Sequence, residues 1–136
     1  MSGVLIDSNV LLDIATEEPR WIEWSVARLA EVLDGGEAAV INSIIYAELS
    51  AGYSTLKALD MVLSDLGVVR EDLPWPAAFA AGRAFVAYRR RGGARTSPLP
   101  DFFIGAHALE AGHRLLTRDA SRYRTYFPDL ELIAPT

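Results

Sequence analysis

Short aliphatic runs alternate with longer amphipathic segments along this chain. The aliphatic runs cover residues 4–6, 38–41, 68–69, 115–117 and 130–133. Runs of this kind, rich in Val, Ile and Leu and without a polar alternation, are typical of strands that are buried on both faces. The pattern therefore predicts five short strands, with the first near the centre of a sheet and the last at an edge.

Between these runs, apolar residues recur every three to four positions, which indicates helices that bury one face. The expected helices cover residues 10–14, 20–34, 44–52, 55–66, 77–91, 101–109 and 120–126. Proline and glycine bound several of them, and Ser8 or Asn9 is expected to cap the first helix, as Asn42 or Ser43 caps the third. Strands that alternate with helices predict an α/β fold, a mainly parallel five-stranded sheet flanked by helices, in one domain spanning residues 1–136.

The composition changes this picture little and excludes several classes of protein. The chain is 51% hydrophobic and 23% charged, as expected of a compact domain, and it has no apolar run long enough to span a membrane. It contains no cysteine, which excludes disulfides and thiolate metal sites and suits the cytoplasm. A net charge of −5 argues against a protein that coats nucleic acid through its overall field. Its twelve arginines and one lysine favour phosphate or acidic partners, or reflect a GC-rich genome.

Four acidic residues are expected to gather at one edge of this sheet. Asp7 directly follows the first strand, and Asp119 comes two residues after the end of the fourth. Open α/β sheets form their ligand crevice at the carboxyl ends of the strands. Glu48 lies inside an apolar helix, at or beside its buried stripe, and Asp101 is in the first turn of another apolar helix.

Each acid also has a purely structural interpretation. Asp7 is at a place where a turn begins, and Asp119 is suited to capping the short helix that follows it. Asp101 complements a helix dipole, and Glu48 is suited to pairing with an arginine. These interpretations remain open for each residue alone, but together they require four coincidences.

Converging carboxylates repel one another, and a proton or a cation relieves the repulsion. A site made only of oxygen ligands suits Mg²⁺ or Mn²⁺. Such ions activate water and stabilise the charge that develops on a phosphate during in-line attack. The pattern therefore favours phosphodiester hydrolysis without a side-chain nucleophile.

With these motifs in view, the chain resembles the PIN-domain family, and within it the small VapC-like ribonuclease toxins of bacterial toxin–antitoxin pairs. The resemblance extends over nearly the whole chain. The motifs that carry it are Val4-Leu5-Ile6-Asp7-Ser8-Asn9, Tyr46-Ala47-Glu48-Leu49, Asp101-Phe102-Phe103-Ile104-Gly105-Ala106-His107-Ala108 and Leu115-Leu116-Thr117-Arg118-Asp119. Each motif is short, but their order and separation make the set specific.

The resemblance implies a parallel five-stranded sheet between helices, a divalent-metal endoribonuclease activity, and dimers inhibited by a cognate antitoxin. The acidic quartet of the family is matched by Asp7, Glu48, Asp101 and Asp119, and its supporting polar positions are matched by Asn9 and Thr117. Two features depart from the family: Gly105 stands where alanine is common, and the arginine-rich loop before Asp101 is long. Neither departure removes a ligand.

That loop is the clearest change of composition in the chain. Its arginines are expected either to hold the RNA backbone beside the acidic site or to form a solvated helix end. They are Arg89, Arg90, Arg91 and Arg95. We interpret His107 and His113 as structural residues, with general-base catalysis as the alternative.

Two other classes of function are compatible with an Asp after the first strand. A phospho-receiver or aspartyl-phosphate phosphatase needs a lysine near the phosphoryl group, but the only lysine, Lys57, falls on a helix away from the strand ends. The second alternative is a non-catalytic module that keeps the pocket only to bind a partner. Four intact carboxylates argue against that loss of catalysis.

Overall fold

The computed structural model describes residues 3–93 and 99–136. Its strands are β1 (Val4–Ile6), β2 (Ala39–Ile41), β3 (Val69–Arg70), β4 (Arg114–Leu116) and β5 (Leu132–Ile133). Its helices are α1 (Ser8–Ala15), α2 (Ile22–Asp34), α3 (Ser43–Ser50), α4 (Leu56–Leu66), α5 (Trp75–Arg90), α6 (Leu99–Ala111) and α7 (Ser121–Tyr126). The predicted α/β class and the order of elements are confirmed, with differences of only a few residues at the ends of elements.

The five strands form one sheet in the order β3-β2-β1-β4-β5, and all neighbouring strands are parallel. β1 is central, and Val4, Leu5 and Ile6 are fully buried. After β1 the chain passes to β2 on one side of it and later returns to β4 on the other side. The carboxyl end of β1 is therefore the point where the strand order reverses, which is where open α/β sheets place their ligand crevice.

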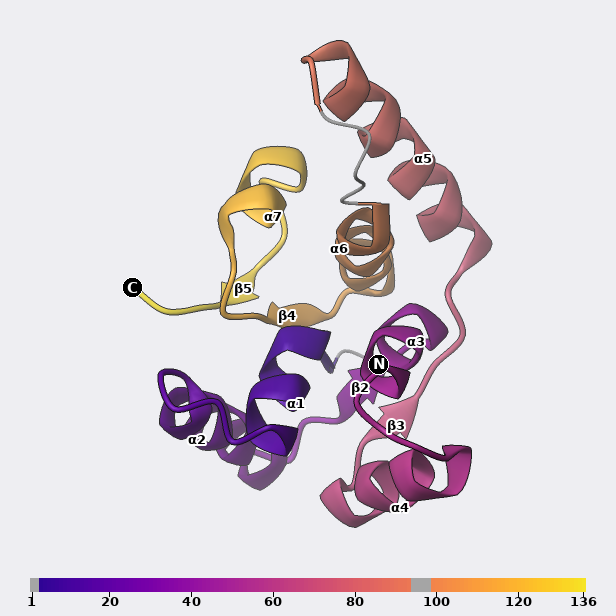
Figure 1. Cartoon of the computed structure of the whole chain (residues 1–136). Helices are drawn as coiled ribbons and strands as arrows, with labels where there is room; N and C mark the ends of the chain where they lie inside the picture. Colours follow the sequence, from indigo (N-terminus) through magenta and orange to yellow (C-terminus); the bar gives the residue numbers. More distant parts are fainter. Residues whose placement is uncertain (1–2, 94–98) are drawn as a thin grey trace.

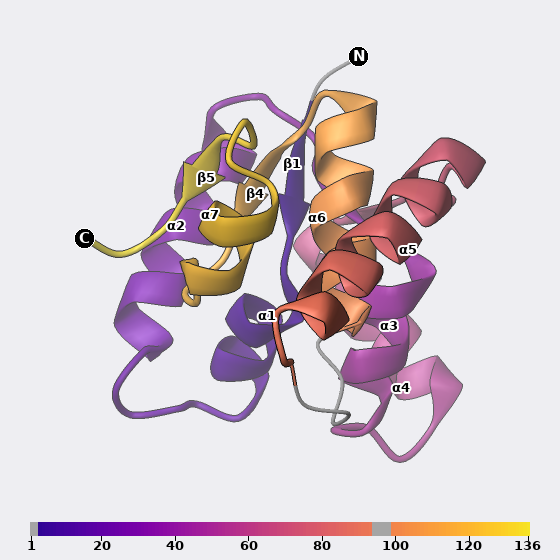
Figure 2. The same ribbon diagram turned by 90° about the horizontal axis from the view of Figure 1, so that it is seen from above.

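Helices cover both faces of the sheet. In Figure 1, α1 and α2 lie on one side of β4, and α6 and α7 lie on the other side. Figure 2 shows α5 running along the outer side of α6, and α5 buries the small side chains of Ala77 and Ala81. The sheet is thus enclosed between two helical layers, as its continuous apolar strands require. No helix among the described residues combines the length and the apolar character that crossing a bilayer requires.

Local signals explain most of the helix boundaries. Asn42 caps α3 by accepting a hydrogen bond from the Ile45 amide, as predicted. The cap predicted for the first helix is wrong, because α1 begins at Ser8 and neither Ser8 nor Asn9 caps it. Asp7 stands in the capping position instead, yet its side chain makes no capping bond. The side chain of Asp7 is directed to partners on other elements.

Packing explains why residue 105 is a glycine and not the alanine expected there. A Cβ atom at this position would lie 2.6 Å from Cδ2 of Phe127 and 3.1 Å from Cδ1 of Tyr123. Both distances are too short for an undisturbed side chain. Glycine therefore lets the segment 123–127 approach α6 closely.

Candidate active site

Asp7 and Thr117 lie side by side at the carboxyl ends of adjacent strands. Ile6 is paired with Leu116 in the β1–β4 ladder, so each of these two residues is the next one after its strand. Asp7 is only 3% exposed, and Thr117 is fully buried. A carboxylate buried to this extent needs hydrogen-bond donors or a cation.

Three donors meet at one oxygen of Asp7. Its Oδ2 atom accepts hydrogen bonds from the hydroxyl of Thr117 at 2.9 Å, from the hydroxyl of Tyr123 at 2.9 Å and from Nδ2 of Asn9 at 3.3 Å. Asn9 also donates to Thr117, at 3.2 Å. The other oxygen, Oδ1, accepts no hydrogen bond from any residue that the structure describes. One oxygen is therefore fixed by the protein, and the other is left without a protein donor.

Two further carboxylates at this site come from helices α3 and α6. Glu48 on α3 is half-buried, and its Oε1 atom accepts a hydrogen bond from the Ser8 hydroxyl at 2.8 Å. Asp101, in the first turn of α6, lies 3.5 Å from the Tyr123 hydroxyl through its Oδ1 atom. Glu48 is not paired with an arginine in the described part of the chain, which removes the main structural interpretation of this residue.

The acids perturb one another as expected for a shared site. Burial is the main cause that raises the pKa of Asp7 to about 6; the charges of Asp101 and Glu48 act in the same direction, and the hydrogen bonds from Tyr123 and Thr117 oppose the shift. Burial also raises the pKa of Glu48, against its bond from Ser8 and with help from the charge of Asp101. Two carboxylates that resist ionisation, Asp7 and Glu48, therefore lie beside the charge of Asp101, and a cation would stabilise such a site.

The remaining predicted acid, Asp119, lies beside this group. Its backbone amide donates to Oγ1 of Thr117 at 3.1 Å, but its exposed side chain has no hydrogen-bond partner within the described residues. It does not cap α7, because Ala120 occupies that position. Asp119 lines a cavity of about 370 Å³ with Ser121, Arg122, Thr125 and Tyr126. The structure therefore brings three of the predicted acids together and places the fourth at the edge of the group.

Within residues 3–93 and 99–136, one arginine contacts an acid of this site, and it is not one of those singled out in the sequence. Nη1 of Arg122 lies 2.6 Å from Oδ2 of Asp101, in an ion pair that is partly open to solvent. Among the predicted arginines, Arg89 and Arg90 are exposed at the end of α5, and the Arg91 guanidinium lies 5.6 Å from the centre of the Tyr126 ring. Arg95 lies outside the described residues.

Sequence reasoning missed Tyr123, Arg122 and the role of Ser8. Tyr123 and Arg122 belong to a six-residue helix that carries no recognisable motif. The partner of Tyr123 is 116 positions away along the chain. The apolar spacing indicates that Tyr123 on α7 and Phe127 just after it are buried, but it does not reveal where the Tyr123 hydroxyl is directed.

The donor set fits a hard divalent cation. All candidate ligands are carboxylate oxygens. Asp7 keeps one oxygen free of described donors, the Ser8 hydroxyl bonds to Glu48, and Oδ1 of Asp101 lies 3.5 Å from the Tyr123 hydroxyl. Carboxylate oxygen is the ligand type that Mg²⁺ and Mn²⁺ prefer. Such a centre can activate water and stabilise negative charge on a phosphate.

A second cluster also satisfies the geometric condition for a metal. Ligand atoms of Glu71, His107 and His113 all lie within 4.8 Å of one another. However, Nδ1 of His113 accepts a bond from the Gly3 amide, and Nδ1 of His107 faces Nδ2 of Asn42, whose Oδ1 is engaged in capping α3. Both rings therefore carry their proton on Nε2 and donate it to Oε1 of Glu71 at 2.8 Å. No ring nitrogen keeps a lone pair for a metal, so this cluster is a closed structural network.

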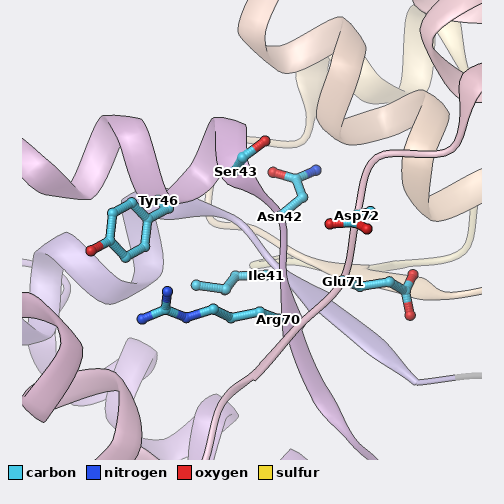
Figure 3. Close-up of a pocket in the computed structure, with 7 residues that line it drawn as sticks. All are labelled: Ile41, Asn42, Ser43, Tyr46, Arg70, Glu71 and Asp72. Carbon is cyan, nitrogen blue, oxygen red and sulfur yellow. The ribbon is translucent and has the colours of Figure 1, made fainter.

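A separate cavity of about 220 Å³ lies near the ends of β2 and β3 (Figure 3). Its lining comprises Ile41, Asn42, Ser43, Tyr46, Arg70, Glu71 and Asp72, and none of the four predicted acids. Arg70 lies over the Tyr46 ring at 4.8 Å and pairs with Asp60, which also accepts a bond from Tyr46. Arg70 and Tyr46 are thus engaged with each other and with Asp60.

Comparisons of the sequence with family models and of the structure with solved structures give consistent results. The family model for the PIN domain matches residues 4–128. Among solved structures, a chain of VapBC2 from Rickettsia felis, bound to a DNA fragment from its promoter, is similar with a TM-score of 0.73 and 22% identity over 100% of both chains. DNA-bound VapBC from Salmonella typhimurium gives a TM-score of 0.71 and 21% identity over 98% of both chains. A toxin–antitoxin complex from Klebsiella pneumoniae gives 0.64 and 20% over 98% of both chains. No curated protein sequence matches the chain.

Proposed function

This chain belongs to the PIN-domain family, and from that premise we propose that it is a divalent-metal-dependent endoribonuclease and the toxin of a toxin–antitoxin pair. The observation that carries the proposal is the free oxygen of buried Asp7, next to Glu48 and Asp101. A family match combined with three mutually repelling carboxylates favours a metal-dependent hydrolase over a fold that is retained only for binding.

In this proposal Asp7, Glu48 and Asp101 hold Mg²⁺ or Mn²⁺, and Asp119 acts at the edge of the site, directly or through water. The ion supplies the acidity that activates water and the positive charge that stabilises the phosphate during attack. Thr117 and Asn9 fix the carboxylate of Asp7, as groups that bond to metal ligands commonly do. Nothing in this arrangement requires a nucleophilic side chain.

RNA would reach this acidic site across basic residues. Arg122 already touches Asp101, and Arg91 lies over Tyr126, which lines the same cavity as Arg122 and Asp119. Arg89 and Arg90 are proposed to extend the basic surface from the end of α5, and Arg95, outside the described residues, is proposed to contact RNA as well. Positive charge beside a carboxylate site reduces the repulsion between the acids and an RNA backbone.

Partner proteins are the second part of the proposal. The similar solved structures include VapBC and toxin–antitoxin complexes, and we extend to this chain a cognate antitoxin, a homodimer and a cytoplasmic location. One face of α5 leaves Trp75 89% exposed and Phe79 72% exposed. Large apolar side chains exposed together favour a protein interface.

The ion pair between Arg122 and Asp101 is the one observation that favours a non-catalytic binding module, because the guanidinium neutralises a carboxylate that would otherwise bind a metal ion. Asp7 and Glu48 have no such pair within the described residues. The exposed position of Lys57 on α4 argues against a phospho-receiver.

An RNA-cleavage assay tests the proposal. The wild-type chain should cleave RNA in Mg²⁺ or Mn²⁺, and EDTA should abolish this cleavage. The variants Asp7→Asn and Asp101→Asn should both lose RNA cleavage but remain folded. Asp65→Asn, an exposed acid on α4, is the matched control and should cleave like wild type. Cleavage that persists in EDTA, or in both site variants purified in the same way, would contradict the proposed function.

A further inference from the structure

The hydroxyl of Tyr123 is the least expected group at the acidic site. We propose that Tyr123 is a positioning residue for the metal centre: by donating to Oδ2 of Asp7, its hydroxyl turns Oδ1 toward the cation. This inference rests on the proposed function and adds to it a residue that no sequence motif identifies.

The geometry around Asp7 supports this role. A carboxylate held by a single donor can rotate about its last bond and present either oxygen. Here the hydroxyls of Tyr123 and Thr117 both lie 2.9 Å from Oδ2, and they come from different elements of the chain. Two strong donors from two directions, with Asn9 as a third at 3.3 Å, fix the plane of the carboxylate. Oδ1 then has one orientation, and no described residue donates to it.

The Tyr123 hydroxyl is shielded from solvent, since the residue is only 1% exposed. Because it has one proton to give, the 2.9 Å contact to Asp7 takes precedence over the 3.5 Å contact to Asp101.

The packing of α7 holds the tyrosine in place. The Tyr123 ring lies against α6 where Gly105 has no side chain, and the amide of Phe127 closes the helix on the Tyr123 carbonyl at 2.8 Å. The same helix α6 carries Asp101 in its first turn. The contact between α6 and α7 therefore sets the position of the Tyr123 hydroxyl relative to Asp101.

A purely structural role is the competing explanation, because a buried aromatic ring contributes to the core in any case. The two explanations differ in what the hydroxyl does. A ring needed only for packing is replaced by phenylalanine without effect on the metal site. A hydroxyl that fixes Asp7 is not replaced, because groups that bond to metal ligands change metal affinity about 10-fold to 100-fold when they are removed.

The experiment compares Mn²⁺ binding in four proteins by calorimetric titration: wild type, Tyr123→Phe, Tyr88→Phe and Asp7→Asn. Tyr88 is the matched control, since it packs against Phe102 of α6 at 5.7 Å between ring centres and its hydroxyl bonds to no described residue. We expect Mn²⁺ affinity to fall about tenfold in Tyr123→Phe, to stay unchanged in Tyr88→Phe and to be lost in Asp7→Asn. Thermal unfolding in EDTA establishes that each variant is folded.

A kinetic measurement separates positioning from general damage. In RNA cleavage, Tyr123→Phe should raise the Mn²⁺ concentration needed for half-maximal rate about tenfold and recover most of the wild-type rate at saturating Mn²⁺.

Two failures are distinguishable. Wild-type Mn²⁺ affinity in Tyr123→Phe, with affinity lost in Asp7→Asn, would overturn the role of Tyr123 alone. No Mn²⁺ binding by the wild-type chain would overturn the proposed metal-dependent function and this inference with it. If Tyr123→Phe unfolds, Thr117→Val tests the same oxygen, and unchanged Mn²⁺ affinity in that variant would overturn the proposal.

Discussion

The hydroxyl of Ser8 donates to Oε1 of Glu48 across 2.8 Å, joining the first turn of α1 to the middle of α3. Ser8 is the residue after Asp7, so a single turn at the end of β1 supplies one acid and holds a second. This bond also opposes the effect of burial on the pKa of Glu48. The two residues are 40 positions apart, and the contact is available only after α3 has packed against α1.

Replacing Ser8 with alanine should weaken metal binding moderately. Loss of a hydrogen bond to a carboxylate is worth about 1 kcal/mol, or about fivefold in affinity. We expect a fivefold rise in the Mn²⁺ dissociation constant, measured by calorimetry. Ser43→Ala is the control, since Ser43 is exposed and its hydroxyl bonds to no described residue. An equal effect of both substitutions would show that Ser8 does not hold Glu48 for the metal.

The stability of the metal-free protein should fall as pH rises. An aspartate in an unfolded chain titrates near pH 3.9, whereas burial raises the pKa of Asp7 to about 6. Between these values the folded state binds more protons, so the contribution of Asp7 is fully present below about pH 4 and is lost as pH rises through 6. The difference amounts to at most about 3 kcal/mol.

Asp7→Asn removes that pH dependence. In EDTA at pH 8 the variant should be more stable than wild type by several degrees in Tm, and the advantage should shrink toward pH 4. Thermal unfolding across this pH range measures the effect. A stability difference that does not change with pH would mean that Asp7 is not the buried acid described above.

Arg122 should compete with the metal for Asp101. Their ion pair is partly exposed, so its strength is of the order of 0.2–1 kcal/mol. Arg122→Gln should therefore tighten Mn²⁺ binding up to about fivefold and weaken RNA binding. Arg124→Gln, an exposed neighbour on α7, should leave Mn²⁺ affinity unchanged. Weaker Mn²⁺ binding in Arg122→Gln would show that the guanidinium supports the site instead of blocking it.

The network of Glu71, His107 and His113 should matter for folding and not for metal binding. Glu71→Ala leaves two buried Nε2–H donors without their acceptor, at a cost of about 1–3 kcal/mol in the free energy of unfolding. Urea unfolding should show this loss, and the Mn²⁺ affinity should equal that of wild type. Asp72→Ala, at the exposed neighbouring acid, is the control. Loss of Mn²⁺ affinity in Glu71→Ala would identify the network as a metal site.

The exposed face of α5 should be an interface between two copies of this chain. Phe79→Glu places a charge in the apolar patch and should shift the protein from dimer to monomer in light scattering. Met61→Glu, at an exposed apolar residue on α4, should leave the dimer intact. An unchanged mass for Phe79→Glu would exclude this face as the dimer contact.

Much of the fold could be predicted because its signals are local. The run from Val4 to Ile6 has no polar residue, and it forms the central, fully buried strand. Asn42 caps the predicted helix because an Asn side chain reaches the amide three residues ahead. The cap predicted from Ser8 or Asn9 was wrong for the opposite reason, since their side chains bind partners that lie far away in the chain.

Local patterns in the sequence were enough to predict the order of strands and helices and the placement of Asp7, Glu48 and Asp101 at the ends or inner faces of those elements. The spacing of apolar residues and the ends of strands depend on residues that are close in the sequence, so both can be predicted from the sequence. The groups that contact the acids depend instead on how the helices pack: the Tyr123 hydroxyl on Asp7, the Ser8 hydroxyl on Glu48 and the Arg122 guanidinium on Asp101. Hydrogen bonds and ion pairs act over about 3 Å in space, whatever the separation along the chain. The packing of α7 against α6 therefore decided which side chains came within that distance.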